Sequence, residues 1–191
     1  MRAFVSVLVT ATLALPLGAA TLEVRVTTPS GAVAPDAVVY AVPAVPVSVG
    51  HRIAYMDQRN RTFVPHVLPV QTGTWVEFPN SDNIRHQVYS TSPAKRFQLP
   101  LYTGKPAFPV QFDKPGVVEL GCNIHPEMSA FIVVVDTPFF ATTDGGHAVL
   151  DNLGPGKYTI HVWYPGMRVE PDPKLLTLEA GDHPTVSFVA G

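Results

Sequence analysis

The sequence has little cysteine, little charge and no extended helical pattern. One cysteine among 191 residues excludes an intrachain disulfide. Charged residues make up 15% of the chain and the net charge is −2, so a basic surface for nucleic acid is not expected. No stretch of ten residues has helical periodicity without an intervening proline or glycine, and proline inside a helix removes a backbone donor. These absences exclude a helical bundle, a disulfide scaffold and a typical nucleic-acid-binding domain.

The chain is nevertheless rich enough in apolar residues to build a core. Hydrophobic residues make up 46% of it, and 20 prolines and 14 glycines separate short runs of alternating or fully apolar residues. Such runs, bounded by turn residues, are typical of β-sandwiches and barrels. We therefore predict an all-β chain, with strands near residues 22–26, 37–42, 75–78, 117–120, 131–135, 158–163 and 186–188.

The first 20 residues predict export. Arg2 precedes an apolar segment that Pro16 ends, and Gly18 and Ala20 supply small residues at cleavage spacing. The apolar segment is shorter than the roughly 20 residues needed to span a bilayer, and no later segment is long enough. We expect a cleaved signal peptide over 1–20 and a periplasmic mature protein. A single exported cysteine then needs a reason: an intermolecular bridge, burial or a metal.

The residues around the cysteine favour the metal. Cys122, His125 and Met128 lie within seven residues, so a tight loop at a strand end can direct a thiolate, an imidazole and a thioether to one point. Soft sulfur donors combined with imidazole suit copper. Zinc is the competing metal, but it prefers cysteine and histidine without a thioether. His86, in a polar loop entering a strand, is the best candidate for a second imidazole.

Three stretches, 63–78, 80–86 and 112–128, together resemble the cupredoxins, the small blue-copper proteins. The resemblance implies a Greek-key β-sandwich that binds one copper ion. It implies that His86, Cys122 and His125 form the trigonal plane of the metal and that Met128 is a long axial ligand. Asn80 and Asn123 would then support the ligand loops from outside the metal's coordination sphere. Gln87 follows the first histidine, where many members have asparagine.

The flanking segments resemble a second fold. Residues 21–51 and 137–191 resemble the two parts of a carboxypeptidase regulatory-like (transthyretin-like) sandwich, so we expect the cupredoxin domain, 52–136, to be inserted within it. The whole arrangement resembles exported proteins often called methylamine utilisation or plastocyanin-like proteins.

The resemblance implies a one-electron carrier rather than an enzyme, with a periplasmic redox partner such as a c-type cytochrome or a dehydrogenase. Two alternatives remain open: a copper-binding or delivery module without electron transfer, and an accessory protein that docks on a larger complex. His51 and His66 are candidates for a second metal site. Asp57 is expected at a turn or on the surface.

Overall fold

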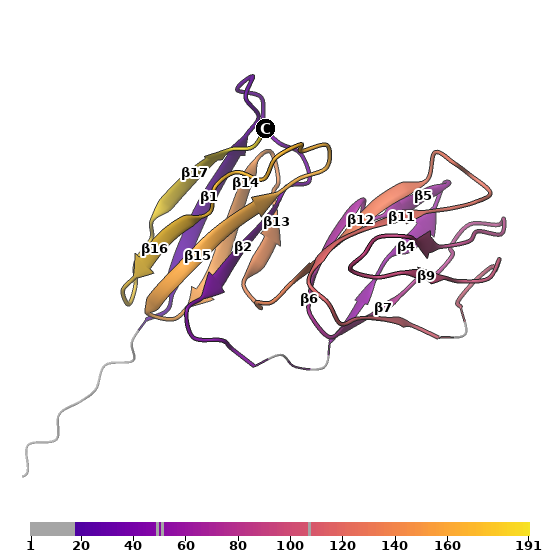
Figure 1. Ribbon diagram of the computed structural model, residues 1–191, viewed down its shortest axis with the longest axis horizontal. Coiled ribbons are helices and arrows are strands. Elements are labelled where there is room, and N and C mark those ends of the chain that lie inside the picture. Colours follow the sequence, from indigo (N-terminus) through magenta and orange to yellow (C-terminus); the bar gives the residue numbers. More distant parts are fainter. Residues whose placement is uncertain (1–17, 49, 51, 107) are drawn as a thin grey trace, which may run out of the picture.

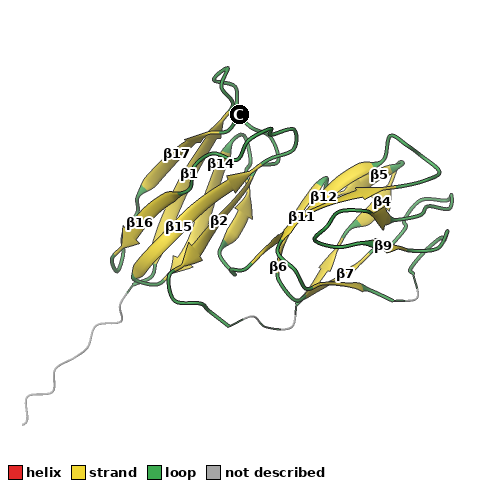
Figure 2. Ribbon diagram, in the orientation of Figure 1, coloured by secondary structure: helices red, strands yellow, loops and turns green. Residues whose placement is uncertain are grey.

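The computed structural model describes residues 18–48, 50, 52–106 and 108–191. The predicted signal peptide, apart from its last three residues, and His51 lie outside these residues. All regular structure in the described part is β-strand, which confirms the all-β prediction (Figure 2). Within the same residues no helix is both long and apolar enough to cross a bilayer.

The strands form two bodies that lie side by side (Figure 1). The outer sandwich consists of strands from both ends of the described chain, and the central sandwich of the strands between them. The outer sandwich contains β1 (Ala20–Thr27), β2 (Val38–Pro43), β13 (Phe140–Thr142), β14 (His147–Leu153), β15 (Gly156–Trp163), β16 (Lys174–Leu178) and β17 (Thr185–Val189).

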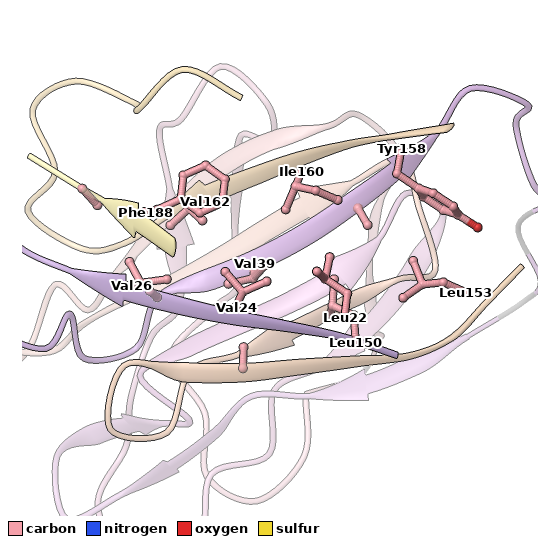
Figure 3. Close-up of a cluster of buried hydrophobic side chains, with 14 of the residues drawn as sticks. Leu22, Val24, Val26, Val39, Leu150, Leu153, Tyr158, Ile160, Val162 and Phe188 are labelled. Carbon is pink, nitrogen blue, oxygen red and sulfur yellow. The ribbon is translucent and has the colours of Figure 1, made fainter. Parts of the chain in front are cut away.

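The outer sandwich has two sheets, with strand orders β14-β1-β17 and β13-β2-β15-β16. Alternating apolar residues point inward from both sheets, as the period of two in a strand requires. In β1, for example, Leu22, Val24 and Val26 are fully buried while Arg25 is exposed. They pack against Val39, Ile160 and other residues of the facing sheet (Figure 3).

The central sandwich contains shorter strands. Its sheets have the orders β10-β7-β3 and β6-β12-β11-β8-β9, and β4 and β5 form a separate hairpin. Their bounds are β3 (Ile53–Tyr55), β4 (Asp57–Arg59), β5 (Thr62–Val64), β6 (Val67–Gln71), β7 (Thr74–Glu77), β8 (Tyr89–Ser90), β9 (Phe97–Gln98), β10 (Val110–Phe112), β11 (Gly116–Gly121) and β12 (Ser129–Val135).

Strand β12 joins the two bodies. Ile132 and Val134 enter the core of the central sandwich, whereas Val133 and Val135 face a smaller cluster that includes Val38 of the outer sandwich. Both faces of β12 are therefore buried, which explains why its sequence is apolar without alternation. The rings of Phe131 and Trp163 extend this contact, with centroids 5.2 Å apart.

Candidate metal centre

Strand pairing places the cysteine and the methionine at the base of one loop. Gly121, the last residue of β11, pairs with Ser129, the first residue of β12. Cys122 and Met128 immediately follow and precede this pair, so they begin and end the seven-residue loop between the strands. Inside the loop the N–H of Met128 donates to the carbonyl of His125 at 3.0 Å. This turn folds the loop back on itself and brings His125 over its base.

His86 reaches the same point from a second loop. It lies in the loop between β7 and β8, and its backbone exchanges two 3.0 Å hydrogen bonds with Tyr102. The ring is fully buried. Its Nδ1 lies 3.1 Å from Nδ1 of His125, and Sγ of Cys122 lies 4.0 Å from that same His125 nitrogen. The loop thus supplies the second imidazole next to the first.

The three donor atoms form a compact group. The ligand atoms of His86, Cys122 and His125 all lie within 4.8 Å of one another, and they are the one such group among the described residues. Donors that share a metal ion at about 2 Å lie about 3–4 Å apart, so the spacing fits a single bound ion. Met128, 2% exposed, lies in the same buried cluster as Cys122.

One further side chain contacts this group, and it was not identified from the sequence. Asp82 lies four residues before His86, and its Oδ2 accepts a hydrogen bond from Nε2 of that ring at 2.8 Å. Burial alone would raise the pKa of Asp82, but hydrogen bonds from the Arg61 N–H, the His86 ring and the Asn60 N–H lower it below its usual value. A carboxylate four residues before the histidine was the available signal.

Asn80 holds the loop that carries both Asp82 and His86. Its Nδ2 donates to the carbonyls of Ile84 and Tyr102, at 2.9 and 3.0 Å, and its Oδ1 accepts from the N–H of Asp82 at 3.0 Å. The side chain is buried, and every one of these bonds is to backbone. Asn80 therefore fixes the loop's path through hydrogen bonds to its backbone.

Asn123 connects the two ligand loops. Its Nδ2 donates to Oε1 of Gln87 at 2.6 Å. Each residue is the immediate neighbour of a ligand candidate, Cys122 in one loop and His86 in the other. Gln87 thus makes a hydrogen bond that joins the two loops.

The β4–β5 hairpin also contacts this loop. Its first residue, Asp57, was expected at a turn or on the surface, and that expectation was wrong. Asp57 is only 8% exposed; it accepts hydrogen bonds from Ser81 Oγ and Arg59 Nε. Burial would raise its pKa, but these bonds and the N–H of Gln58 lower it overall. Gln58 Nε2 donates to the hydroxyl of Tyr102 at 2.6 Å. Burial raises the pKa of Tyr102 to about 12.

A hollow of about 380 Å³ lies beside the two candidate sulfur ligands, Cys122 and Met128. Both are among its lining residues, and the ring of Tyr89 lies against Gly121. A Cβ at position 121 would lie 2.8 Å from that ring, so glycine is required for this close approach. The centre is therefore buried under the loops but bordered by solvent on its thiolate side.

His66 lies away from this group. Its Nδ1 is 3.0 Å from Oδ2 of Asp36, a residue of the outer sandwich. Its ring also meets Phe131 edge-on, with centroids 5.7 Å apart. His66 therefore contacts the boundary between the sandwiches, and the described residues place no second metal-ligand group around it.

No known family model matches the sequence, and no curated protein matches it. Among solved structures, a Cu-containing nitrite reductase from Thermus scotoductus SA-01 is 28% identical, with a TM-score of 0.42. The match covers 49% of this chain but only 26% of that one. A reduced amicyanin variant is 20% identical (TM-score 0.40), covering 50% of this chain and 99% of its own. A purple cupredoxin from Nitrosopumilus maritimus is 22% identical (TM-score 0.38), covering 44% and 99%.

Proposed function

We propose that this protein binds one copper ion and carries single electrons between periplasmic redox partners. The observation that carries the proposal is the compact group of His86, Cys122 and His125, with Met128 buried beside it. Two imidazoles, one thiolate and a weak thioether are the donor set of blue-copper electron-transfer sites. Bound copper would supply a one-electron couple between Cu(I) and Cu(II).

The frame around the donors suits electron transfer because it resists movement. His86 and Cys122 are buried, and each lies next to a β-bridge or a strand. Asn80 and Asn123 add hydrogen bonds within and between the loops. Donors held by packing and by hydrogen bonds keep one geometry whatever the charge of the ion, so little reorganisation accompanies transfer.

The partner would approach over His125, the least buried of the three donor residues. His125 is half-buried, and its neighbours Ile124 and Pro126 are exposed; Ile124 is 51% exposed. An exposed apolar surface of this kind fits a weak and transient complex. We propose a c-type cytochrome or a dehydrogenase in the periplasm as the partner, reached after export by the predicted signal peptide.

Metal analysis and a visible spectrum of the purified protein test the proposal. We expect one copper per chain and an intense blue absorption band from the thiolate. Cys122→Ser removes the band, whereas Ser129→Ala, an exposed residue at the other end of the loop, keeps it. A colourless copper complex, or a band that survives the cysteine substitution, contradicts the proposal. Catalytic reduction of nitrite by the loaded protein would contradict the carrier role.

The hollow beside Cys122 and Met128 favours a second candidate, a copper-delivery module. An acceptor or a chelator entering it would meet the sulfur ligands first. Delivery requires that Cu(I) exchange rapidly with a competing chelator, whereas a carrier keeps its copper. The exchange rate of the reduced protein distinguishes the two functions.

A further inference from the structure

We propose that Asp82 is a positioning residue that prepares His86 to bind the metal, and that the turn of the β4–β5 hairpin holds Asp82 in place. This inference rests on the proposed copper function. It concerns the buried imidazole, whose two nitrogens have different neighbours: the carboxylate on one side and the other ligand candidates on the opposite side.

The carboxylate decides which nitrogen of His86 carries the proton. A carboxylate only accepts hydrogen bonds, so the 2.8 Å contact with Asp82 Oδ2 requires a proton on Nε2. A neutral imidazole then has its lone pair on Nδ1, the nitrogen that lies 3.1 Å from Nδ1 of His125. Nδ1 is therefore ready to donate to a metal before any metal arrives.

The hairpin turn holds the carboxylate from the opposite side. The backbone N–H of Asn60 donates to Asp82 Oδ1 at 2.6 Å, and that of Arg61 donates to Oδ2 at 2.9 Å. Both turn residues have positive φ, 52° and 58°, as a two-residue hairpin turn of the primed type requires. This conformation directs two successive N–H groups at one carboxylate. Asp82 thus has no freedom to leave His86 without breaking the turn's hydrogen bonds.

The hairpin in turn is fixed to the ligand loop at its other end. Asp57 accepts from Ser81 Oγ. The backbone N–H of Gln58 donates to the carbonyl of Pro79 and its carbonyl accepts from the N–H of Ser81, both at 3.0 Å. The hairpin therefore holds the loop at Asp82 through its turn, and again at Pro79 and Ser81 through its first strand. This double attachment distinguishes Asp82 from a carboxylate that merely lies near a histidine on the surface.

Two consequences follow for the loaded protein. Partners of ligand histidines typically change metal affinity by about 10- to 100-fold when removed, so Asp82→Ala should weaken copper binding by that factor. A negative charge behind the imidazole also favours the more positive oxidation state. Removal of that charge in Asp82→Asn should therefore raise the reduction potential.

The experiment combines nuclear magnetic resonance of the metal-free protein with copper competition. Nitrogen shifts of the His86 ring should show a protonated Nε2 in the wild type and a mixture of the two tautomers in Asp82→Ala. Copper affinity, measured against a chelator, should fall about 10- to 100-fold in the same variant. Asp113→Asn is the matched control, because that carboxylate pairs with Lys95 on the surface. It should change neither measurement.

The outcomes separate this inference from the proposed function. If the wild type binds no copper, the function fails, but the tautomer of His86 still tests Asp82 in the metal-free protein. If the wild type is blue and the Asp82 variants keep its tautomer, affinity and potential, the positioning role is overturned. Should Asp82→Ala fail to fold, Asp82→Asn keeps the side chain's size, removes the charge and replaces one accepting oxygen with an NH2 donor.

Discussion

The two sandwiches of this molecule are stabilised in different ways. The outer sandwich has long strands, including eight residues each in β1 and β15, and its core is almost wholly apolar. The central sandwich has several strands of two or three residues and contains most of the buried polar side chains. Those polar residues are Asp57, Gln58, Gln71, Thr74, Asn80, His86 and Ser90.

The difference shows what a functional loop requires of its support. A strand such as β1 is stable because its alternate apolar side chains are buried away from water. Burial of this kind requires no particular partner at each position. The loop from 78 to 88 has few ladder bonds, so the side chains of Asn80 and Gln58 bond its backbone groups instead. The carboxylate of Asp82 ties the loop to the backbone of the β4–β5 hairpin. Buried polar groups of this kind are costly unless each is paired, but they fix one geometry.

The largest expected loss of stability comes from truncating one buried isoleucine in each core, and it tests whether the two sandwiches unfold independently. Ile132 and Ile160 are both fully buried, one in each core, so Ile132→Ala and Ile160→Ala remove the same atoms from different sandwiches. Each should lower the free energy of unfolding by about 2–5 kcal/mol. When thermal unfolding is followed by the copper absorption band, the midpoint temperature should fall in Ile132→Ala and stay unchanged in Ile160→Ala. Equal shifts of the band in both variants would mean that the sandwiches unfold as one unit.

A smaller loss of stability is expected when alanine replaces either of two glycines, one in each sandwich, whose Cα atoms are closely approached by other groups. A Cβ at Gly121 would meet the ring of Tyr89 at 2.8 Å, and one at Gly146 would meet the backbone carbonyl of Val26 at 2.8 Å. Gly146 also has a φ of 76°, which disfavours alanine. Gly146→Ala should cost about 1–3 kcal/mol, because a strand backbone moves less easily than a ring.

Gly121→Ala should cost less stability but should change the visible spectrum, because Tyr89 lies beside Cys122 in the hollow. Chemical unfolding and the position of the blue band measure the two effects. If Gly121→Ala costs more than Gly146→Ala, the ring of Tyr89 is held as rigidly as the backbone. An unchanged band would show that Tyr89 does not influence the thiolate.

The elements that could be predicted from the sequence are those that depend on near neighbours. The alternation of Leu22, Val24 and Val26 predicts a half-buried strand, and β1 is that strand. The apolar run from 131 to 135 predicts a central strand, and β12 has neighbours on both sides. Cys122, His125 and Met128 could be grouped because a single loop carries all three.

The support of the site could not be predicted, because it depends on distant backbone groups. The N–H groups that hold Asp82 come from residues 21 and 22 positions earlier, and a backbone donor leaves no mark in the sequence. The expectation that Asp57 would lie at a turn or on the surface was wrong for the same reason. Its partner Ser81 is 24 residues away, on the ligand loop.

The smallest expected effect concerns the polar contact between the two sandwiches. Asp36 and His66 are each almost half exposed, so their 3.0 Å contact is screened by solvent. Either Asp36→Asn or His66→Gln should change the free energy of unfolding by no more than about 1 kcal/mol. The apolar cluster of Val38, Val133 and Val135 should keep the sandwiches together without it. The arrangement of the two sandwiches, measured by small-angle scattering, should therefore be the same in these variants as in the wild type. A more extended particle would show that the contact between Asp36 and His66, rather than the valines, sets the arrangement.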